Sequence, residues 1–250
     1  MTNILSRFGR GLNVVVIGAS GGIGSGFVEN LIQEQNVLNI NCFSRHEIWP
    51  YDLKEGLKLE WGYLDLEDEE SIKAAASKIS RELPIDILIL ATGMLYNDTI
   101  LPEKSLSELS TEKFQKLFMI NTIGPALIAK YFTPYLRRDK KSIFTMLSAR
   151  VGSIGDNNFG GWYSYRTSKA ALNMLIKNVA IELARKYKQA IVVGLHPGTV
   201  DTKLSQPFQS NIDKVFTANE AAINLIKVMN KLTPDDTGSV FDWAGKIIEC

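Results

Sequence analysis

The sequence predicts a single α/β domain in which a doubly wound parallel sheet of about seven strands carries helices on both faces. One observation is that short apolar runs of strand length alternate with longer segments of helical periodicity, as repeated strand–helix–strand units require. The other is that the first apolar run leads into a glycine-rich turn that opens a helix, which is how such sheets often begin. No repeat, low-complexity segment or charge run interrupts this pattern, so we expect one domain over residues 1–250.

The composition is that of an ordinary globular protein. The chain has 250 residues, of which 45% are hydrophobic and 22% charged, and its formal net charge is +1. This balance gives no electrostatic case for binding nucleic acid or an anionic membrane. Cys42 and Cys250 are too few for a disulfide framework or a metal site. We see no signal peptide in residues 1–13 and no run of roughly 18 apolar residues, and therefore expect a cytoplasmic protein.

The first expected strand, Val14–Ile17, is a short β-branched run of the kind that is buried on both faces of a sheet. It continues into Gly18-Ala19-Ser20-Gly21-Gly22-Ile23-Gly24, and an amphipathic helix is expected from Phe27 to Gln33. The glycines let backbone approach a pyrophosphate, at which the helix N–H groups and dipole point. Strand, turn and helix predict a Rossmann-type dinucleotide site; a tight connection without a ligand is the alternative.

The second expected strand, Val37–Phe43, bears on the choice of cofactor. About twenty residues beyond the glycines, NAD-binding units place an acid that holds the ribose 2′-hydroxyl. Here no acid follows the strand, and Arg45 offers a planar cation to a 2′-phosphate. This favours NADP over NAD, with a solvated arginine as the alternative. His46 and His196 lack partners at metal-ligand spacing, and we interpret both as structural.

The next two strands also end in residues suited to a cofactor. Leu57–Leu64 leads into Asp65-Leu66, and the acid could accept from an adenine amino group or simply cap the following helix. Ile85–Leu90 ends in Ala91-Thr92-Gly93, whose small residues would let backbone pass close to a cofactor or form a plain turn.

A long helical pattern from Thr111 to about Arg138 contains Pro125. Because proline has no N–H, the carbonyl of Asn121 loses its helical partner and must bond elsewhere. A water facing an active site is one solution, and a kinked helix without chemistry is the other.

The remaining elements complete the alternation. We expect strands at Ser142–Leu147, ending in Ser148, and at Ala190–Leu195, then a loop over Lys203–Phe216, a helix near Asn219–Lys231 and a short strand at Thr237–Phe241.

The most specific chemical pattern opens the helix after residue 162. Tyr165 and Lys169 are four residues apart and so share one helix face, whereas Tyr163 does not share it. A lysine ammonium beside a phenol favours the phenolate, so we expect the tyrosine pKa to fall from about 10 towards neutrality. Such a phenol exchanges protons with a carbonyl or an alcohol; an exposed pair on an amphipathic helix is the alternative.

Together these residues resemble the short-chain dehydrogenase/reductase family over essentially the whole chain, with five motifs in the family's order. The resemblance implies that Ser148, Tyr165 and Lys169 are catalytic and that Asn121 holds a relay water. It implies no metal. The cofactor-binding residues that it implies are Gly18, Ser20, Gly22, Ile23, Gly24, Arg45, Asp65, Leu66, Ala91, Thr92, Gly93, Asn121, Tyr165, Lys169, Pro197, Gly198, Val200 and Thr202.

Two segments, Leu147–Ser153 and Gly161–Arg166, are similar to the C-factor and sniffer-type carbonyl reductase branch of that family. Two features depart from the family pattern. Ala91-Thr92-Gly93 stands where Asn-Ala-Gly is usual. Ser148 lies farther before Tyr165 than is usual, which leaves Ser153 as a rival; we prefer Ser148 because it directly ends an apolar strand.

The resemblance implies an NADP(H)-dependent oxidoreductase that interconverts a carbonyl and an alcohol by hydride transfer. Tyr165 would protonate the developing alkoxide, Lys169 would lower the tyrosine pKa and hold the nicotinamide ribose, and Ser148 would orient the carbonyl. Phe208, in the loop expected to cover the site, suggests an apolar or aromatic small-molecule substrate. A C-factor-type signalling protein with little turnover and a reductase of C=N or C=C bonds are the alternatives.

Members of the family usually pair through the helices that here carry Asn121 and Tyr165. We therefore expect a homodimer or homotetramer, with Phe132 and Tyr135 as candidate contacts. A monomer in which this apolar stripe belongs to the core is the alternative.

Overall fold

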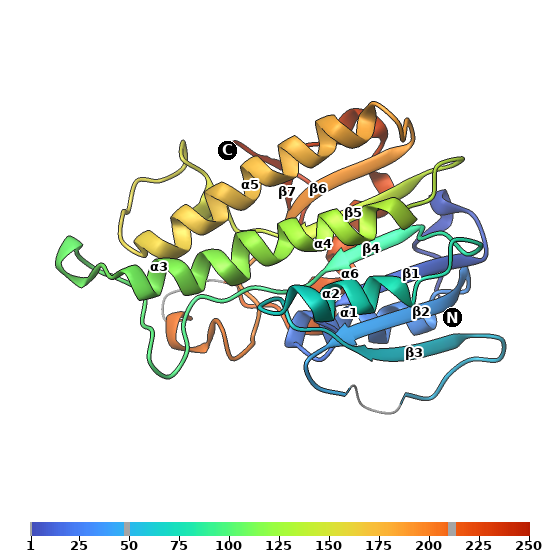
Figure 1. Cartoon of the computed structure of the whole chain (residues 1–250), viewed down its shortest axis with the longest axis horizontal. Coiled ribbons are helices and arrows are strands. Elements are labelled where there is room, and N and C mark those ends of the chain that lie inside the picture. The colour runs from blue at the N-terminus through green and yellow to red at the C-terminus, as the bar shows by residue number, and fades with distance from the viewer. Residues whose placement is uncertain (1, 48–50, 210–213) are drawn as a thin grey trace.

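The computed structural model describes residues 2–47, 51–209 and 214–250, and these form one sheet of eight strands (Figure 1). The sheet order is β3-β2-β1-β4-β5-β6-β7-β8, and every neighbouring pair is parallel except the last. The strands are β1 Leu12–Ile17, β2 Val37–Ser44, β3 Lys58–Tyr63, β4 Ile87–Leu90, β5 Ser142–Leu147, β6 Ala190–His196, β7 Val240–Asp242 and β8 Ile247–Ile248.

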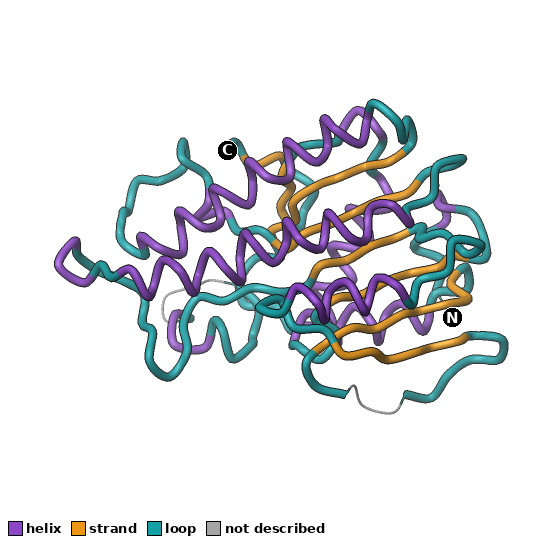
Figure 2. Tube along the Cα trace, viewed as in Figure 1, coloured by secondary structure: helices purple, strands orange, loops and turns teal. Residues whose placement is uncertain are grey.

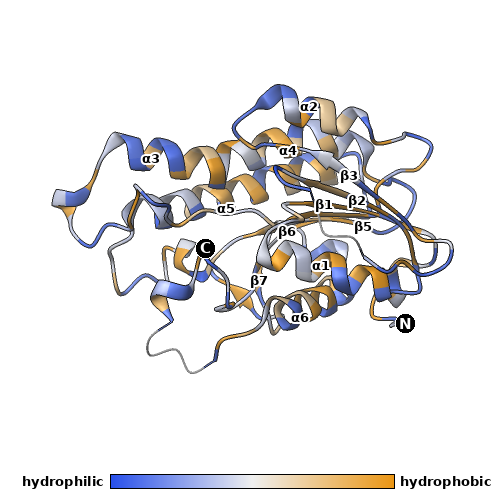
Figure 3. Cartoon of the chain, turned by 90° about the horizontal axis from the view of Figure 1, so that it is seen from below, coloured by the Kyte–Doolittle hydropathy of each residue, from blue (hydrophilic) through white to orange (hydrophobic). Residues whose placement is uncertain are grey.

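Helices cover both faces of the sheet. On one face lie α1, Gly22–Gln33, and α6, Ala218–Lys231 (Figure 3). The other face is covered by α2 Glu69–Ser77, α3 Thr111–Phe118, α4 Gly124–Phe132 and α5 Tyr163–Ala184, and Figure 2 shows the strands between these layers. The predicted doubly wound α/β domain is confirmed.

The central strand β1 shows why the predicted strands read as continuous apolar runs. All six of its residues are buried, because successive side chains point to opposite faces and both faces are covered. Val14 and Val16 join the core beneath α1 and α6, whereas Val15 and Ile17 join the core beneath α2, α4 and α5.

The long helix predicted from 111 to 138 is in fact three pieces. α3 ends at Phe118, a π-helical turn spans Met119–Ile123, and α4 runs only to Phe132. The wide turn lies just before Pro125, which has no N–H to give to a regular helix, and π-turns of this kind often occur at functional sites. Phe132 is fully buried and packs edge-on against Phe43, so this candidate interface contact is a core residue, as the alternative had it.

Two other details differ from the sequence predictions. The N-cap of α2 is Asp68, which accepts from the N–H of Glu70, so Asp65 is not the cap. The edge strand β8 is antiparallel and only two residues long, and its alternation is too short to be recognised in the sequence.

The topology fixes where a ligand would bind. Strand order reverses between β1 and β4, and in such sheets ligands bind beyond the carboxyl ends of the strands at this switch point. Among the helices of the described residues, none is long and apolar enough to cross a membrane.

Candidate active site

Two cavities lie beyond the carboxyl ends of the parallel strands. The first, which we call the glycine-turn cavity, has a volume of about 220 Å³ and is lined by Ile17, Gly18, Ser20, Gly21, Ser44, Arg45, His46, Leu64, Asp65, Leu66, Ala91, Thr92, Gly93 and Ile120. The second, which we call the Tyr165 cavity, has a volume of about 190 Å³. Its lining includes Ile23, Leu95, Ser148, Arg150, Trp162, Tyr165, His196, Pro197, Gly198, Val200, Thr202, Leu204 and Phe208. Most of the residues predicted to bind a cofactor therefore lie around one of these two cavities.

The glycine turn is built so that no side chain fills the first cavity. Gly18 has φ of 86°, in the left-handed region that glycine adopts without strain. A Cβ on Gly24 would lie 2.0 Å from the carbonyl oxygen of Gly18, so only glycine permits this close packing of turn and helix. The turn residues Gly18, Ser20 and Gly21 line the cavity just before α1 begins, and the first N–H groups of a helix are suited to binding an anion.

The opposite wall fits a dinucleotide as well. The hydroxyl of Thr92 is buried and has no hydrogen-bond partner among the described residues. A Cβ at Gly93 would lie 3.3 Å from Nζ of Lys169, so the backbone that lines the glycine-turn cavity also passes close to this lysine. Together with the glycine turn, an unpaired buried hydroxyl and closely packed backbone fit the sugar and phosphate groups of a nicotinamide cofactor.

Arg45 is held at the rim of the glycine-turn cavity by a local network. The indole N–H of Trp61 donates to Oγ of Ser44 and to the carbonyl of His46, both at 3.0 Å. The hydroxyl of Ser44 also donates to that carbonyl. These bonds fix the turn after β2 and leave the Arg45 side chain exposed beside Asp65 and Leu66. His46 supports this turn through its backbone, so no metal role is needed for it.

Tyr165 and Lys169 lie side by side in the first turns of α5, as their spacing predicted. Both are buried, and Nζ of Lys169 lies 5.9 Å from the centre of the Tyr165 ring. That nitrogen donates to the carbonyl of Leu147, at the end of β5, over 2.9 Å. The lysine therefore links the helix to the strand that carries Ser148.

The expected fall of the tyrosine pKa is wrong for this arrangement. Burial raises the pKa of Tyr165 above its ordinary value of 10.0, and burial lowers the pKa of Lys169 to about 8. The lysine charge favours the phenolate, but the loss of water around both groups opposes each charged form and outweighs it. Tyr165 is thus a phenol at neutral pH, the form that can donate a proton.

Ser148 lies directly in the Tyr165 cavity at the end of β5. Its hydroxyl donates to Oδ1 of Asn173 over 2.6 Å, and Nδ2 of Asn173 donates to the carbonyl of Gly152 over 3.3 Å. Ser153 is also buried, but its Oγ accepts from the N–H of Asp156 and it is not part of the cavity lining. The geometry thus favours Ser148 as the serine nearer to a ligand of this cavity.

Asn121 sits in the π-helical turn with its side-chain amide fully engaged. Its Nδ2 donates to the carbonyl of Met94 over 2.8 Å and to Oγ of Ser168 over 3.0 Å, while its Oδ1 accepts from the N–H of Met94 over 2.9 Å. The side chain therefore ties the segment after β4 to α5.

Aromatic and apolar side chains form the outer wall of the Tyr165 cavity. Trp162 packs edge-on against Phe208 at 5.0 Å and against Tyr165 at 6.3 Å, and Tyr96 packs against Phe208 at 5.8 Å. Phe208 belongs to the predicted loop 203–216, of which residues 210–213 lie outside the described residues. Arg150, which also lines the cavity, forms ion pairs with Asp156 and Asp242.

Sequence reasoning missed three residues of this site. Asn173 lies four residues after Lys169 and so continues the Tyr165 face, a spacing that could have revealed it. Trp162 gave no sequence signal, because its left-handed backbone is a property of the fold. His196 lines the cavity, and burial with the nearby Arg150 charge lowers its pKa to about 4, so its imidazole is neutral. Among the described residues, no group of His, Cys, Asp and Glu could hold a metal ion.

Comparison with known proteins identifies a family and several relatives. The family model described as short chain dehydrogenase matches residues 12–213. The chain is 30% identical to 1-hydroxy-2-glutathionyl-2-methyl-3-butene dehydrogenase of Rhodococcus sp. (strain AD45) over 90% of this chain and 93% of that protein. It is also 30% identical to C-signal of Myxococcus xanthus, over 65% of this chain and 90% of that protein.

Solved structures share the same fold. An NADPH-bound carbonyl reductase from chicken fatty liver superposes with a TM-score of 0.82 at 25% identity, covering 99% of this chain and 98% of that one. Carbonyl reductase Sniffer of D. melanogaster superposes with a TM-score of 0.81 at 19% identity, covering 96% of this chain and all of that one.

Proposed function

Because the chain belongs to the short chain dehydrogenase family, we propose that it reduces a carbonyl compound to an alcohol, with NADPH as the reductant. The chain is an NAD(P)-dependent oxidoreductase with a Rossmann-type fold. The observation that carries the proposal is that Ser148 and Tyr165 line one cavity, with the buried Lys169 directly behind Tyr165 and the glycine turn beside them.

The proposed roles follow from the contacts of each side chain. When bound, the reduced nicotinamide supplies a hydride to the carbonyl carbon. Ser148 donates its only hydroxyl proton to Asn173 in this structure and turns that proton to the carbonyl oxygen when a substrate binds. Tyr165, a protonated phenol, donates its proton to the same oxygen as charge develops there. Lys169 stabilises the resulting phenolate, and Asn121 fixes the backbone that borders the lysine. We also propose that the main-chain carbonyl of Asn121 holds a relay water.

Preference for NADP over NAD is part of the proposal. Arg45 supports it, since this exposed cation stands at the rim of the glycine-turn cavity beside Asp65. A guanidinium binds a 2′-phosphate in two parallel hydrogen bonds, which a 2′-hydroxyl cannot match. The carbonyl reductase from chicken fatty liver was solved with NADPH bound.

We assign an apolar, preferably aromatic, carbonyl substrate. The wall formed by Trp162 and Phe208 supports this assignment, because these two aromatic rings offer apolar contact next to Tyr165, and Tyr96 packs against Phe208.

A second candidate function is signalling with little turnover, favoured by the 30% identity to C-signal. Against it, pure nucleotide binding has no need of a buried tyrosine and lysine on one helix face beside a serine.

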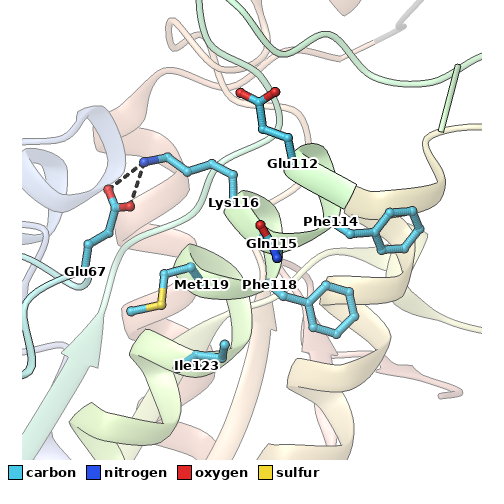
Figure 4. A pocket seen from close by; sticks show the side chains of 8 residues that line it. All are labelled: Glu67, Glu112, Phe114, Gln115, Lys116, Phe118, Met119 and Ile123. Atoms are coloured by element: carbon cyan, nitrogen blue, oxygen red, sulfur yellow. Dashed lines mark hydrogen bonds and ion pairs between the residues drawn. The ribbon is translucent and has the colours of Figure 1, made fainter. Parts of the chain in front are cut away.

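We further propose that two copies pair through α3, α4 and α5. A groove of about 740 Å³ runs along α3, and Figure 4 shows Phe114, Phe118, Met119 and Ile123 around it, with Lys116 paired to Glu67 at 2.7 Å. Ile123, Met174 and Ile181 are about half exposed or more, which leaves apolar surface for a second copy. Light scattering should give a dimer or tetramer, and the Phe118→Asp variant should shift it to monomer; a wild-type monomer would contradict the pairing.

The experiment that tests the function compares NADPH and NADH oxidation against a panel of aldehydes, ketones and quinones. Turnover with an aromatic carbonyl should depend on Tyr165, so Tyr165→Phe should abolish it while NADPH still binds with nearly unchanged affinity. Tyr163→Phe, two residues earlier on the same helix, is the matched control. Wild-type rates in Tyr165→Phe would refute the proposed role, and NADPH binding without turnover on any carbonyl would favour signalling.

A further inference from the structure

The helix that carries Tyr165 begins without a cap of its own. The N-cap residue of α5 is Trp162, whose side chain makes no capping hydrogen bond, and the first turn contains no acidic residue. Trp162 has φ of 49°, in the left-handed region that bulky residues rarely adopt. A 22-residue helix leaves unpaired N–H groups and partial positive charge at this end, so something else must satisfy them.

Glu103 meets this need from a distant part of the chain. Its Oε2 accepts from the N–H of Ser164 over 3.3 Å, and its main-chain carbonyl accepts from the N–H of Trp162. The residue is 0% exposed, and its Oε1 has no hydrogen-bond partner among the described residues. The carboxyl group therefore stands where an N-cap side chain would, at the second residue of the helix.

The segment that carries Glu103 is itself fixed in the fold. Ile100 is buried in the same apolar cluster as Leu117 and Tyr165. The N–H of Ile100 donates to Oδ1 of Asn97 over 2.7 Å, and Pro102 restricts the backbone just before Glu103. Glu103 therefore acts on the start of α5 from a rigid support.

Two functional side chains depend on that start. Tyr165 is the residue after Ser164, and the Trp162 ring contacts both Tyr165 and Phe208 in the cavity wall. We propose that Glu103 is a positioning residue, which caps α5 and thereby sets the place of the proton donor and of the aromatic wall. This inference rests on the proposed reductase function for its kinetic part only.

The test uses three substitutions of Glu103 in the full chain. Glu103→Ala removes the hydrogen bond, Glu103→Asp withdraws the carboxyl by one methylene, and Glu103→Gln keeps an oxygen for the Ser164 N–H. Glu108→Ala is the matched control, since Glu108 also accepts a backbone N–H in the same segment, from Lys104 over 3.0 Å, but is exposed. The readouts are kcat and KM for the best carbonyl of the panel, KM for NADPH, and amide hydrogen exchange at Ser164.

Misplaced catalytic groups lose rate rather than cofactor affinity. We expect kcat to fall about tenfold or more in Glu103→Ala and Glu103→Asp, to stay within about threefold in Glu103→Gln, and KM for NADPH to stay unchanged. Exchange at Ser164 should accelerate in the Ala and Asp variants only. If Glu103→Ala does not fold, Glu103→Asp decides.

Wild-type kcat in a folded Ala or Asp variant would overturn the inference. An equal loss of rate in Glu103→Gln and Glu108→Ala would also overturn the inference. Such a loss would not depend on the hydrogen bond between the Ser164 N–H and Glu103. If the wild-type protein reduces no carbonyl, the proposed function fails. Amide exchange at Ser164 then still decides whether Glu103 caps the helix, because unchanged exchange in Glu103→Ala would overturn the capping role.

Discussion

Oγ of Ser148 donates a hydrogen bond of 2.6 Å to Oδ1 of Asn173, which joins the end of β5 to the third turn of α5. Both residues are buried. Since Tyr165, Lys169 and Asn173 follow one another at intervals of four residues, one helix face supplies the proposed proton donor, its cationic neighbour and the partner of the serine. Asn173 therefore holds the Ser148 hydroxyl in place, and the hydroxyl proton must turn from Asn173 to the carbonyl oxygen when a substrate binds.

The first prediction concerns this pair. Ser148→Ala should lower kcat about 100-fold, the order of loss when one donor to a developing oxyanion is removed. Asn173→Ala should lower kcat about tenfold, since one hydrogen bond is worth on the order of 1 kcal/mol. The double variant should be no slower than Ser148→Ala, because the asparagine acts through the serine.

Asn178→Ala, an exposed position on the same helix, is the control and should match the wild type. Purely additive losses in the double variant would show that Asn173 acts independently of Ser148.

Local spacing predicted the parts of the site that local geometry determines. Tyr165 and Lys169 share a face because a helix has a fixed period. Ser148, Asp65 and Gly93 all lie beyond the carboxyl ends of strands because parallel strands end at one edge of the sheet, although Ser148 lines one cavity and the other two line its neighbour.

Contacts between segments that lie far apart in the sequence could not be predicted from local spacing. The pKa of Tyr165 depends on burial, Glu103 reaches α5 from a remote loop, and β8 pairs only two residues. No pattern within one segment carries such information, because each depends on how separate elements pack.

The second prediction concerns the cofactor. Arg45→Ala should raise KM for NADPH between about tenfold and a hundredfold, the range expected for a charge-assisted hydrogen bond of about 1.5–3 kcal/mol. KM for NADH should change little, because the 2′-hydroxyl offers no phosphate. Steady-state oxidation of both cofactors measures this, and Arg10→Ala, an exposed arginine before β1, is the control. Equal effects on both cofactors would refute the phosphate role.

The third prediction is a fall in reductase activity at alkaline pH. Burial lowers the pKa of Lys169 to about 8, so the ammonium that stabilises the Tyr165 phenolate is lost as pH rises through that value. We expect kcat/KM for the carbonyl to be level below about pH 8 and to decrease above it, since this ratio reports the free enzyme.

Lys169→Met should be slow at every pH and lack this fall, whereas Lys177→Met, exposed on the same helix, should keep the wild-type profile. A profile that stays level to pH 10 in the wild type would mean that Lys169 does not govern the rate.

The fourth prediction links His196 to stability in acid. Burial and the charge of Arg150 lower its pKa to about 4, against the attraction of Asp242, while the unfolded imidazole has its ordinary value of 6.5. Between these values the unfolded state binds more protons, so the free energy of unfolding should rise with pH across this window and fall as the protein is acidified. The change in the free energy of unfolding across this window amounts to about 3 kcal/mol.

Urea unfolding from pH 4 to 7 measures this change. The free energy of unfolding should vary less with pH in His196→Asn than in wild type, while the profile of His46→Asn, at an exposed position, should run parallel to wild type. Parallel profiles for His196→Asn and wild type would show that the imidazole takes up its proton equally well in the folded protein.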